Sequence, residues 1–372
     1  MKFVIITHVP HFVYGNSISA YAPYVMEMNI WSKYVDELII VAPRSFQKKE
    51  SIDCNYSHSK IKFIEINSFD VLSSKNTFLA LLKIPIIGIT IFKAMRYSDH
   101  IHLRCPGNIG LLGCLIQVFF PKKTKTAKYA GNWDPCAKQP LSYRFQKWIL
   151  HNTFLTKNMN VLVYGTWNNQ SKNIKSFFTA TYSDADIEEI QPRKLEGQIN
   201  FIFVGTLTKG KQPLYAIQLI EALKMKGFEV NLSIYGEGAE MPFLKHYIES
   251  NNLHPFICLK GNVSKETMKG VYKNSHFLLL PSKSEGWPKV IAEAMFWGCL
   301  PVTTSVSCVS SMLGFGSRGI LLTEFLSDDT QNILQLLENQ VAYEHKIKEA
   351  VAWSQMFTTN KFEYEIKKLV AS

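Results

Sequence analysis

Two glutamates stand eight residues apart in segment 280–295, which reads Leu-Pro-Ser-Lys-Ser-Glu-Gly-Trp-Pro-Lys-Val-Ile-Ala-Glu-Ala-Met. The apolar run before it predicts a strand, Gly286 predicts a turn, and Pro288 is typical of the first turn of a helix. A helix that begins there presents free backbone N–H groups and a positive dipole end, which together suit a diphosphate. Glu285 could then reach a group held beside the phosphate, and Glu293 a pair of hydroxyls further along.

The two acids also have an ordinary structural interpretation, in which one caps the helix and the other lies on its surface. Their setting is more specific. The order strand, Pro-Ser, Glu-Gly-x-Pro-x-Val-x-x-Glu-Ala-Met, followed by Gly298, Pro301 and Val302, resembles the E-x7-E signature of the family 4 glycosyltransferases with the GT-B fold.

Three further segments resemble the same family, in the same order along the chain. Residues 203–211 (Phe-Val-Gly-Thr-Leu-Thr-Lys-Gly-Lys) resemble its Gly-Arg-Leu-x3-Lys loop. Residues 234–238 resemble its Gly-x-Gly after the second strand, and residues 259–263 its Gly-x-Val segment along the nucleotide base. The resemblance covers about residues 199–322 and is much looser in the first half.

The resemblance implies a retaining, hexosyltransferase-type glycosyltransferase that moves a sugar from a nucleotide diphosphosugar to a hydroxyl acceptor. It implies that Lys211 pairs with the donor diphosphate, that Glu285 is catalytic at the transferred sugar, and that Glu293 holds the ribose. The donor site it implies comprises Gly205, Lys209, Lys211, Gly236, Gly238, Asn262, Val263, Gly286, Trp287, Pro288, Lys289, Val290 and Glu293. It implies neither a cofactor nor a metal.

One residue departs from the family pattern, because the arginine of its loop is Thr206 here. An arginine binds phosphate with two parallel hydrogen bonds, whereas a lysine replaces only the charge. Lys209 or Lys211 must therefore supply more of the positive charge. The alternative is that both lysines are ordinary exposed loop charges.

The first half offers acceptor-side candidates after its predicted strands, where such folds admit ligands. Asp134 is the second predicted catalytic residue: the only carboxylate between Arg104 and Lys147, it would bind or polarise the acceptor hydroxyl. Its alternative role is to form an Asp-Pro turn. Arg104 is expected to contact an anion. The predicted acceptor or anion site comprises Gly15, Asn16, Arg104 and Asn132.

Short apolar runs alternate with helical stretches throughout, which predicts an α/β protein of two Rossmann-like, doubly wound parallel-sheet domains that face a central cleft. We expect an acceptor domain at 1–182, a linker at 183–198, a donor domain at 199–355, and a helix at 356–372 that packs back on the first domain. Strands are predicted at 3–7, 38–42, 61–66, 100–104, 127–131, 161–164, 177–181, 199–204, 230–235, 256–259, 276–280, 300–303 and 320–322. Helices are predicted at 109–120, 213–226, 241–251, 289–297 and 343–369.

The composition excludes a disordered chain and bears on membrane spans and on the cellular compartment. With 47% hydrophobic residues in 372, the chain is not disordered, and its longest apolar runs, 84–92 and 109–120, fall short of a membrane span. Seven scattered cysteines without a C-x-x-C pair, and no signal-peptide pattern, indicate reduced thiols in the cytoplasm.

The positive charge is concentrated in the first half: residues 1–190 hold 22 basic and 13 acidic side chains, a net charge of +9. This predicts an anionic partner, and simple solubility is the alternative. Lys122, Lys123, Lys125 and Lys128 suggest docking on the inner face of the cytoplasmic membrane. That would suit a lipid-linked glycan acceptor in bacterial surface polysaccharide assembly.

Other function classes have less support. A nucleotide-sugar epimerase of the same architecture and a non-enzymatic sugar- or nucleotide-binding protein remain alternatives. A nucleic-acid binder is not expected, because the lysines are not interleaved with aromatic residues as in RNA-binding sheets. Asp184-Ala185-Asp186 has the Asp-x-Asp spacing of a manganese site, but its place in a polar linker favours the start of a helix.

Overall fold

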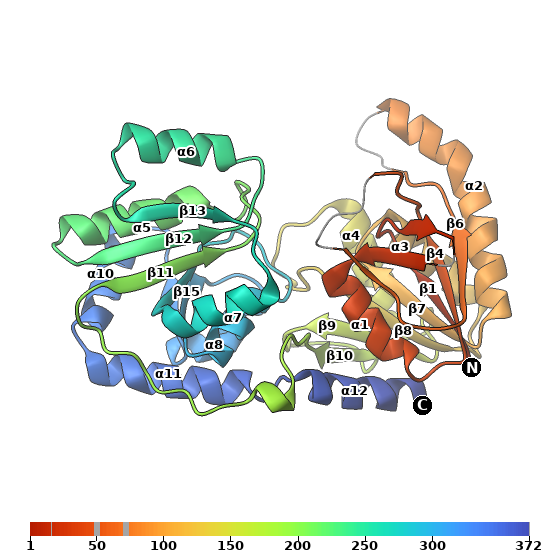
Figure 1. The fold of residues 1–372 in the computed structure, drawn as a ribbon. Helices are drawn as coiled ribbons and strands as arrows, with labels where there is room; N and C mark the ends of the chain where they lie inside the picture. The colour runs from red at the N-terminus through yellow and green to blue at the C-terminus, as the bar shows by residue number, and fades with distance from the viewer. Residues whose placement is uncertain (16, 48–52, 70–73, 372) are drawn as a thin grey trace. The chain divides into compact units, whose positions relative to one another are not determined.

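The computed structural model describes residues 1–15, 17–47, 53–69 and 74–371, excepting the side chains of 74–79, 81 and 371. The chain divides into two compact units (Figure 1). The N-unit is Met1–Phe178 with Phe362–Ser372, and the C-unit is Thr179–Lys361. Asn16, predicted in the acceptor site, lies outside the described residues. Segment 183–198, expected as a linker, is part of the C-unit.

The N-unit contains a seven-stranded parallel sheet in the order β10-β9-β8-β7-β1-β4-β6. Its strands are β1 (Lys2–Ile6), β4 (Glu37–Ala42), β6 (Ile61–Glu65), β7 (His100–Cys105), β8 (Thr124–Tyr129), β9 (Met159–Tyr164) and β10 (Ile174–Phe177). The direction of winding reverses between β1 and β7, and ligands of such sheets bind beyond the carboxyl ends at that point.

A small antiparallel sheet of β2 (Phe12–Tyr14), β3 (Ser17–Tyr21) and β5 (Asp53–Asn55) was not predicted. Its strands are too short to show an alternating apolar pattern. The predicted strand at 177–181 is wrong: β10 ends at Phe177 and the chain continues without strand structure. Aromatic residues at 177 and 178 gave that segment a strand-like composition, but they pack against the C-terminal helix instead.

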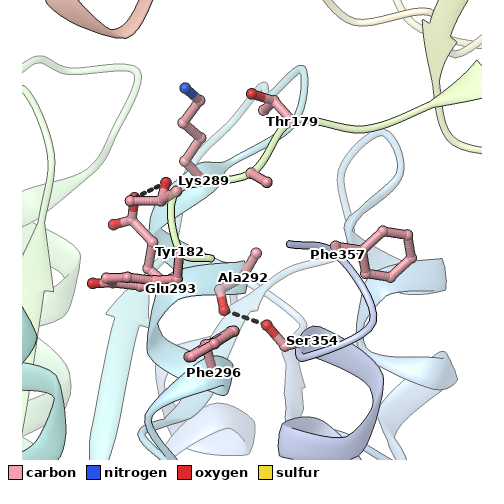
Figure 2. Close-up of a pocket in the computed structure, with 10 residues that line it drawn as sticks. Thr179, Tyr182, Lys289, Ala292, Glu293, Phe296, Ser354 and Phe357 are labelled. Atoms are coloured by element: carbon pink, nitrogen blue, oxygen red, sulfur yellow. Dashed lines mark hydrogen bonds between the residues drawn. The ribbon is translucent and has the colours of Figure 1, made fainter. Parts of the chain in front are cut away.

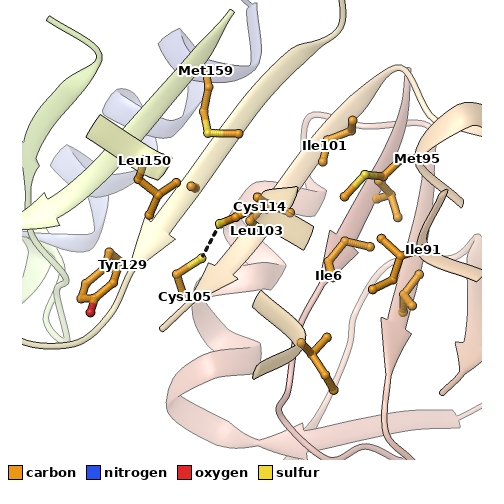
Figure 3. Close-up of a cluster of buried hydrophobic side chains, with 14 of the residues drawn as sticks. Ile6, Ile91, Met95, Ile101, Leu103, Cys105, Cys114, Tyr129, Leu150 and Met159 are labelled. Atoms are coloured by element: carbon orange, nitrogen blue, oxygen red, sulfur yellow. Dashed lines mark hydrogen bonds between the residues drawn. The ribbon is translucent and has the colours of Figure 1, made fainter. Parts of the chain in front are cut away.

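Three helices cover one face of the N-unit sheet: α2 (Ser74–Tyr97), α3 (Asn108–Ile116, followed by the 3₁₀ turn η1, Gln117–Phe119) and α4 (Leu141–His151). Ile91 and Met95 of α2 and Cys114 of α3 pack with Ile6 and Leu103 of the sheet in one apolar core (Figure 3). On the other face, Trp31 of α1 (Ala22–Ser32) packs against Phe3 and His102, with ring centroids 5.7 and 4.7 Å apart.

The C-unit sheet has six parallel strands in the order β13-β12-β11-β14-β15-β16. The strands are β11 (Ile199–Val204), β12 (Val230–Tyr235), β13 (Ile257–Gly261), β14 (Phe277–Leu280), β15 (Leu300–Thr304) and β16 (Ile320–Leu322). The helices are α5 (Pro213–Met225), α6 (Met241–Ser250), α7 (Lys265–Asn274), α8 (Lys289–Phe296), α9 (Val309–Met312), α10 (Leu326–Leu337) and α11 (Gln340–Ser354), with 3₁₀ turns η2 (Asp184–Asp186) and η3 (Gly314–Gly316). The winding reverses between β11 and β14, so the loops after these two strands are where a ligand is expected.

The C-terminal region, expected as one helix, forms two. α11 ends at Ser354 and α12 (Thr359–Ala371) follows. In the N-unit, Phe362 of α12 is buried, with its ring 5.5 Å from Phe177 and 5.8 Å from Phe178. The last helix thus completes the apolar edge of the N-unit next to β10.

The predicted cluster of four exposed lysines at 122–128 is wrong. Lys125 and Lys128 point into the N-unit and are fully buried. Lys123 caps the end of α2, donating to the carbonyl oxygens of Met95, Arg96 and Ser98. Only Lys122 is exposed. Lys125 and Lys128 belong to β8, an interior strand of the parallel sheet, and such strands are buried on both faces.

Candidate active site

The loops that follow β11 and β12 approach each other so closely that only glycine fits. Gly236 has φ +133°, and a Cβ atom there would lie 2.0 Å from the carbonyl oxygen of Gly205. The backbone N–H of Gly205 donates to Tyr235 O at 3.0 Å, and that of Leu207 to Glu237 O at 2.9 Å. Gly205, Gly236 and Gly238, all predicted in the donor site, therefore fix the two loops against each other.

Lys211 and Glu285 meet at the point where the winding of the C-unit sheet reverses. Lys211 comes from the loop after β11 and Glu285 from the loop after β14. The Lys211 ammonium donates to Glu285 Oε1 at 2.5 Å. The Glu285 side chain is 7% exposed and that of Lys211 is 28% exposed. The sequence predicted a diphosphate partner for Lys211 and a sugar partner for Glu285; the structure shows that the two side chains also form an ion pair with each other.

Several hydrogen bonds hold the backbone around Glu285. Gln212 Nε2 donates to Pro281 O at 2.6 Å, and Thr304 Oγ1 donates to Ser282 O. Cys308 Sγ donates to the carbonyl oxygen of Gly286 at 3.0 Å. Burial, followed by weaker effects that include the Glu285 charge, raises the pKa of the Cys308 thiol to about 12, so it remains a neutral donor. Gln212, Thr304 and Cys308 gave no sequence signal, because their roles depend on tertiary proximity.

Trp287, predicted in the donor site, turns its ring toward the end of α11. It stacks on Trp353 at 6.1 Å between centroids and meets Phe357 edge-on at 5.7 Å. Ser354 Oγ also donates to Ala292 O at 2.5 Å (Figure 2). These contacts anchor the start of α8 on α11. The ring of Trp287 thereby supports the loop that carries Glu285.

Helix α8 begins where the sequence predicted, with Pro288 at its N-cap and no side-chain cap hydrogen bond. The positive end of its dipole can stabilise an anion there. The side chains of Lys289 and Val290 are half-buried on its first turn. Lys289 lines a small cavity further along the helix (Figure 2).

Glu293 lies in that cavity and is already hydrogen-bonded. Thr181 Oγ1 donates to Glu293 Oε1 at 2.6 Å, a bond that Figure 2 draws as a dashed line to Glu293. The Tyr272 hydroxyl donates to Glu293 Oε2 at 3.1 Å. The cavity measures about 10 Å³, close to the space one water molecule needs. Thr181 thus occupies an oxygen of Glu293, and the contact with a ribose predicted for this residue stays a prediction. Burial, reinforced by the Glu293 charge, holds the pKa of Tyr272 well above its usual value, which keeps this hydroxyl a donor.

The remaining predicted donor residues are exposed loop positions. Thr206 and Lys209 are exposed in the loop after β11. Asn262 and Val263 are exposed directly after β13.

In the N-unit, Arg104 lies at the carboxyl end of β7, next to the reversal point. Its Nη1 is 3.3 Å from Glu27 Oε1, and the buried Lys128 ammonium is 4.0 Å from the same oxygen. Glu27, a buried acid of α1, was not predicted. Two cations facing one carboxylate leave a surplus positive charge at this edge, so the anion contact predicted for Arg104 remains a prediction.

Asn132 and Asp134 form consecutive turns. Asn132 Oδ1 accepts from the N–H of Asp134 at 2.8 Å, and Asp134 Oδ1 accepts from the N–H of Cys136 at 2.8 Å. This is the turn-forming alternative that the sequence left open for Asp134. Gly15 has φ +56° and open space around it. Whether Asp134 also polarises an acceptor stays a prediction.

Asp186 caps η2 instead of facing a metal. Its Oδ2 accepts from the N–H of Ser183 at 2.9 Å and its Oδ1 from Lys269 at 3.1 Å. The Ser183 backbone hydrogen bond, with further help from Lys269, lowers the pKa of Asp186 to about 2. The predicted helix start at this segment is confirmed. Over the described residues, no three His, Cys, Asp or Glu side chains gather as a metal site.

Solved structures of other proteins share the fold of this chain. The structure of HepE from Anabaena in complex with UDP and glucose superposes with a TM-score of 0.69 at 15% identity, over 100% of this chain and 99% of that chain. The prediction of a GT-B fold with two doubly wound sheets is thereby confirmed.

Sequence relatives match over part of their length. An uncharacterized glycosyltransferase of Methanocaldococcus jannaschii is 25% identical over 54% of this chain and 56% of that protein. The capsular polysaccharide biosynthesis glycosyltransferase CapH of Staphylococcus aureus is 27% identical over 34% of this chain and 36% of that protein. The chain thus spans between about a third and just over half of the curated relatives it matches.

A family model described as glycosyl transferases group 1 matches residues 184–352. This range contains both strands at the reversal point and the Lys211–Glu285 pair, together with the Glu293 cavity of α8. The part of the chain that carries these features, residues 184–352, is thus the part that is similar to the glycosyl transferases group 1 family.

Proposed function

We propose that this protein transfers a sugar from a nucleotide diphosphosugar to a hydroxyl of a glycan acceptor, with retention at the anomeric carbon. The observation that carries the proposal is the Lys211–Glu285 pair just before the start of α8, within the segment that matches the glycosyl transferases group 1 model. HepE, which has the same fold, holds UDP and glucose.

The chemistry requires that the leaving diphosphate be stabilised as its negative charge develops. Lys211 supplies a cation at 28% exposure, and the first N–H groups of α8 supply oriented dipoles. Both are held in place before the reaction, which is what makes electrostatic stabilisation effective. When the diphosphate draws Lys211 toward itself, Glu285 is released from its partner and becomes available to the sugar beside it.

The acceptor side is proposed for the N-unit, whose surplus charge around Arg104 and Lys128 suits an anionic glycan carrier. CapH of Staphylococcus aureus acts in capsular polysaccharide biosynthesis. By analogy we propose a glycan of a bacterial surface polysaccharide as acceptor, carried on a lipid at the cytoplasmic face of the membrane. No helix in the described parts of the chain is long and apolar enough to cross a bilayer.

Substitution of Glu285 tests the reaction directly. Glu285→Gln keeps the shape of the side chain and its contact with Lys211 but removes the charge, so sugar transfer should fall by at least a hundredfold while UDP, GDP or ADP binding is retained. Glu229→Gln is the matched control, because Glu229 pairs with Lys224 at 2.8 Å on the surface of the same unit. Unchanged turnover by Glu285→Gln would remove this residue from the mechanism.

The epimerase alternative makes a different product. A transferase releases nucleoside diphosphate and links the sugar to the acceptor, whereas a nucleotide-sugar epimerase would convert the donor to its epimer, with no net release of nucleotide and no consumption of acceptor. Incubation of each donor with and without a polysaccharide or lipid-linked acceptor fraction, followed by detection of both products, separates the two. Conversion of the donor to its epimer without consumption of acceptor would contradict transfer.

A further inference from the structure

Helix α2 exposes apolar side chains on the side opposite its core contacts. Leu82, Ile86 and Ile89 are 60, 66 and 57% exposed, and Phe92 continues the same stripe. Their spacing of three and four residues places them along one face of the helix, while Ile87, Ile91 and Met95 face the sheet. A row of large exposed aliphatic side chains is unusual for a protein surface and marks an interaction site.

The apolar surface continues onto the two neighbouring helices. Phe119, exposed after α3, has its ring 6.3 Å from that of Phe92. α4 exposes Leu141, Phe145 and Trp148 at the same helical spacing. All three helices pack on the same face of the N-unit sheet, and α3 contacts both α2 and α4, so their outer sides form one layer. We call this outer side the α2–α4 face.

The charges around the α2–α4 face are almost all positive. The exposed basic residues on or beside it are Lys93, Arg96, Lys122, Lys138, Arg144 and Lys157. Asp99 and Asp134 are the only acids in residues 74–157. Asp99 accepts a hydrogen bond from the N–H of Lys2, and Asp134 closes its own turn. Leucine, isoleucine, phenylalanine and tryptophan among lysine and arginine are typical of surfaces that lie in a membrane interface.

We propose that the α2–α4 face docks on an anionic lipid bilayer, with the apolar stripe of α2 inserted among the headgroups. This inference rests on the proposed function, because it would bring the protein to a lipid-carried acceptor. A second copy of the chain fits less well, because a two-fold contact uses the same face of both copies and would bring two positively charged surfaces together. An RNA or DNA would leave the aliphatic stripe of α2 in water.

Vesicle sedimentation tests the proposal. The full chain should bind vesicles of phosphatidylcholine with one third phosphatidylglycerol, and bind pure phosphatidylcholine much more weakly. Each basic residue near such a surface contributes about fivefold to binding, so Lys93→Gln with Arg96→Gln should lower the partition coefficient roughly 25-fold. Ile86→Asp with Ile89→Asp should lower the partition coefficient at least tenfold, relative to an exposed apolar residue of the C-unit that is likewise replaced by aspartate.

The controls lie on exposed positions of the C-unit. Met225→Asp matches the apolar substitutions, since Met225 is 84% exposed on α5, and Lys226→Gln matches the basic ones. Both should leave vesicle binding unchanged. Because every substituted side chain is exposed, circular dichroism and nucleotide binding should be as in the unaltered protein, which excludes misfolding.

Failure of this inference is distinguishable from failure of the proposed function. If the unaltered chain does not sediment with anionic vesicles, or if the α2 variants sediment as well as Met225→Asp, the α2–α4 face does not dock on lipid. Self-association lost in the α2 variants, without vesicle binding, would identify a second copy as the occupant and overturn the proposal. Transfer to a water-soluble acceptor should persist in all these variants. The proposed function itself would fail only if the unaltered protein transferred no sugar, or if Glu285→Gln transferred it equally well.

Discussion

Replacement of Lys211 by methionine should destabilise the C-unit, because it leaves a carboxylate without its cation. The Glu285 side chain is only 7% exposed, so water cannot replace the lost partner. A hydrogen bond between charged groups contributes about 1.5–3 kcal/mol, and leaving one member buried costs an amount in the upper part of that range. We expect Lys211→Met to lower the free energy of unfolding by about 2–3 kcal/mol.

The assay is urea denaturation followed by tryptophan fluorescence, with Lys224→Met as matched control. The Lys224–Glu229 pair has the same residue types at 2.8 Å, but its side chains are 34 and 69% exposed. An exposed pair of this kind contributes roughly 0.5 kcal/mol at most. Adding Glu285→Gln to Lys211→Met should restore much of the loss, because the uncompensated charge is then gone.

Two results would refute this reasoning. If Lys211→Met costs no more than Lys224→Met, the burial of Glu285 does not make it depend on the lysine. If Lys211→Met stabilises the protein, the pair is held in place at a net cost, as charged groups at active sites can be. In either case the release of Glu285 by a diphosphate could not be the step that the proposed mechanism requires.

Three further predictions concern other residues. Gly236→Ala should lower Tm by several degrees, because its Cβ would lie 2.0 Å from Gly205 O, whereas Gly270→Ala, with open space inside α7, should raise it slightly; equal shifts would contradict the loop contact. Thr181→Val should tighten UDP, GDP or ADP binding in calorimetry, because it frees Glu293 Oε1 for a ribose hydroxyl, and weaker binding would contradict that role. Burial lowers the pKa of His11 and of His100 to about 4, below the unfolded value of about 6.5. Between pH 6.5 and 4 the unfolded chain therefore binds more protons than the folded one. As the pH is lowered through that window, the free energy of unfolding should fall by about 1.4 kcal/mol per pH unit for each histidine. His100→Gln should reduce the slope of the free energy of unfolding against pH, and substitution of the exposed His254 by Gln should not. Equal slopes for both variants in urea denaturation would show that His100 does not contribute to the pH dependence.

The fold of the C-unit was predictable to within a residue or two at most strands. β11, β12 and β16 have the predicted bounds, because fully buried parallel strands are continuous apolar runs between polar turns. The N-unit was harder. Its three-residue strands carry no periodicity, and its buried lysines at 125 and 128 interrupt the apolar pattern of β8.

The candidate site was predictable where one short segment carries it. Glu285, the turn and the start of α8 are adjacent in sequence, so their arrangement follows from local geometry. The partners of these residues were not predictable in the same way. Thr181 and Tyr272 reach Glu293 from 112 and 21 residues away, and Glu27 reaches Arg104 from 77 residues away.

By itself, the sequence determined the alternation of strands and helices, the two sheets, and the position of the helix start after Glu285, because these depend on hydrophobic periodicity and on neighbouring residues. Only the tertiary structure decided which charges are available. It paired Lys211 with Glu285, placed Lys125 and Lys128 in the interior, and left the apolar stripe of α2 exposed. The physical reason is that burial and charge pairing arise from groups distant along the chain, and a linear pattern of residue types contains no record of which of them meet.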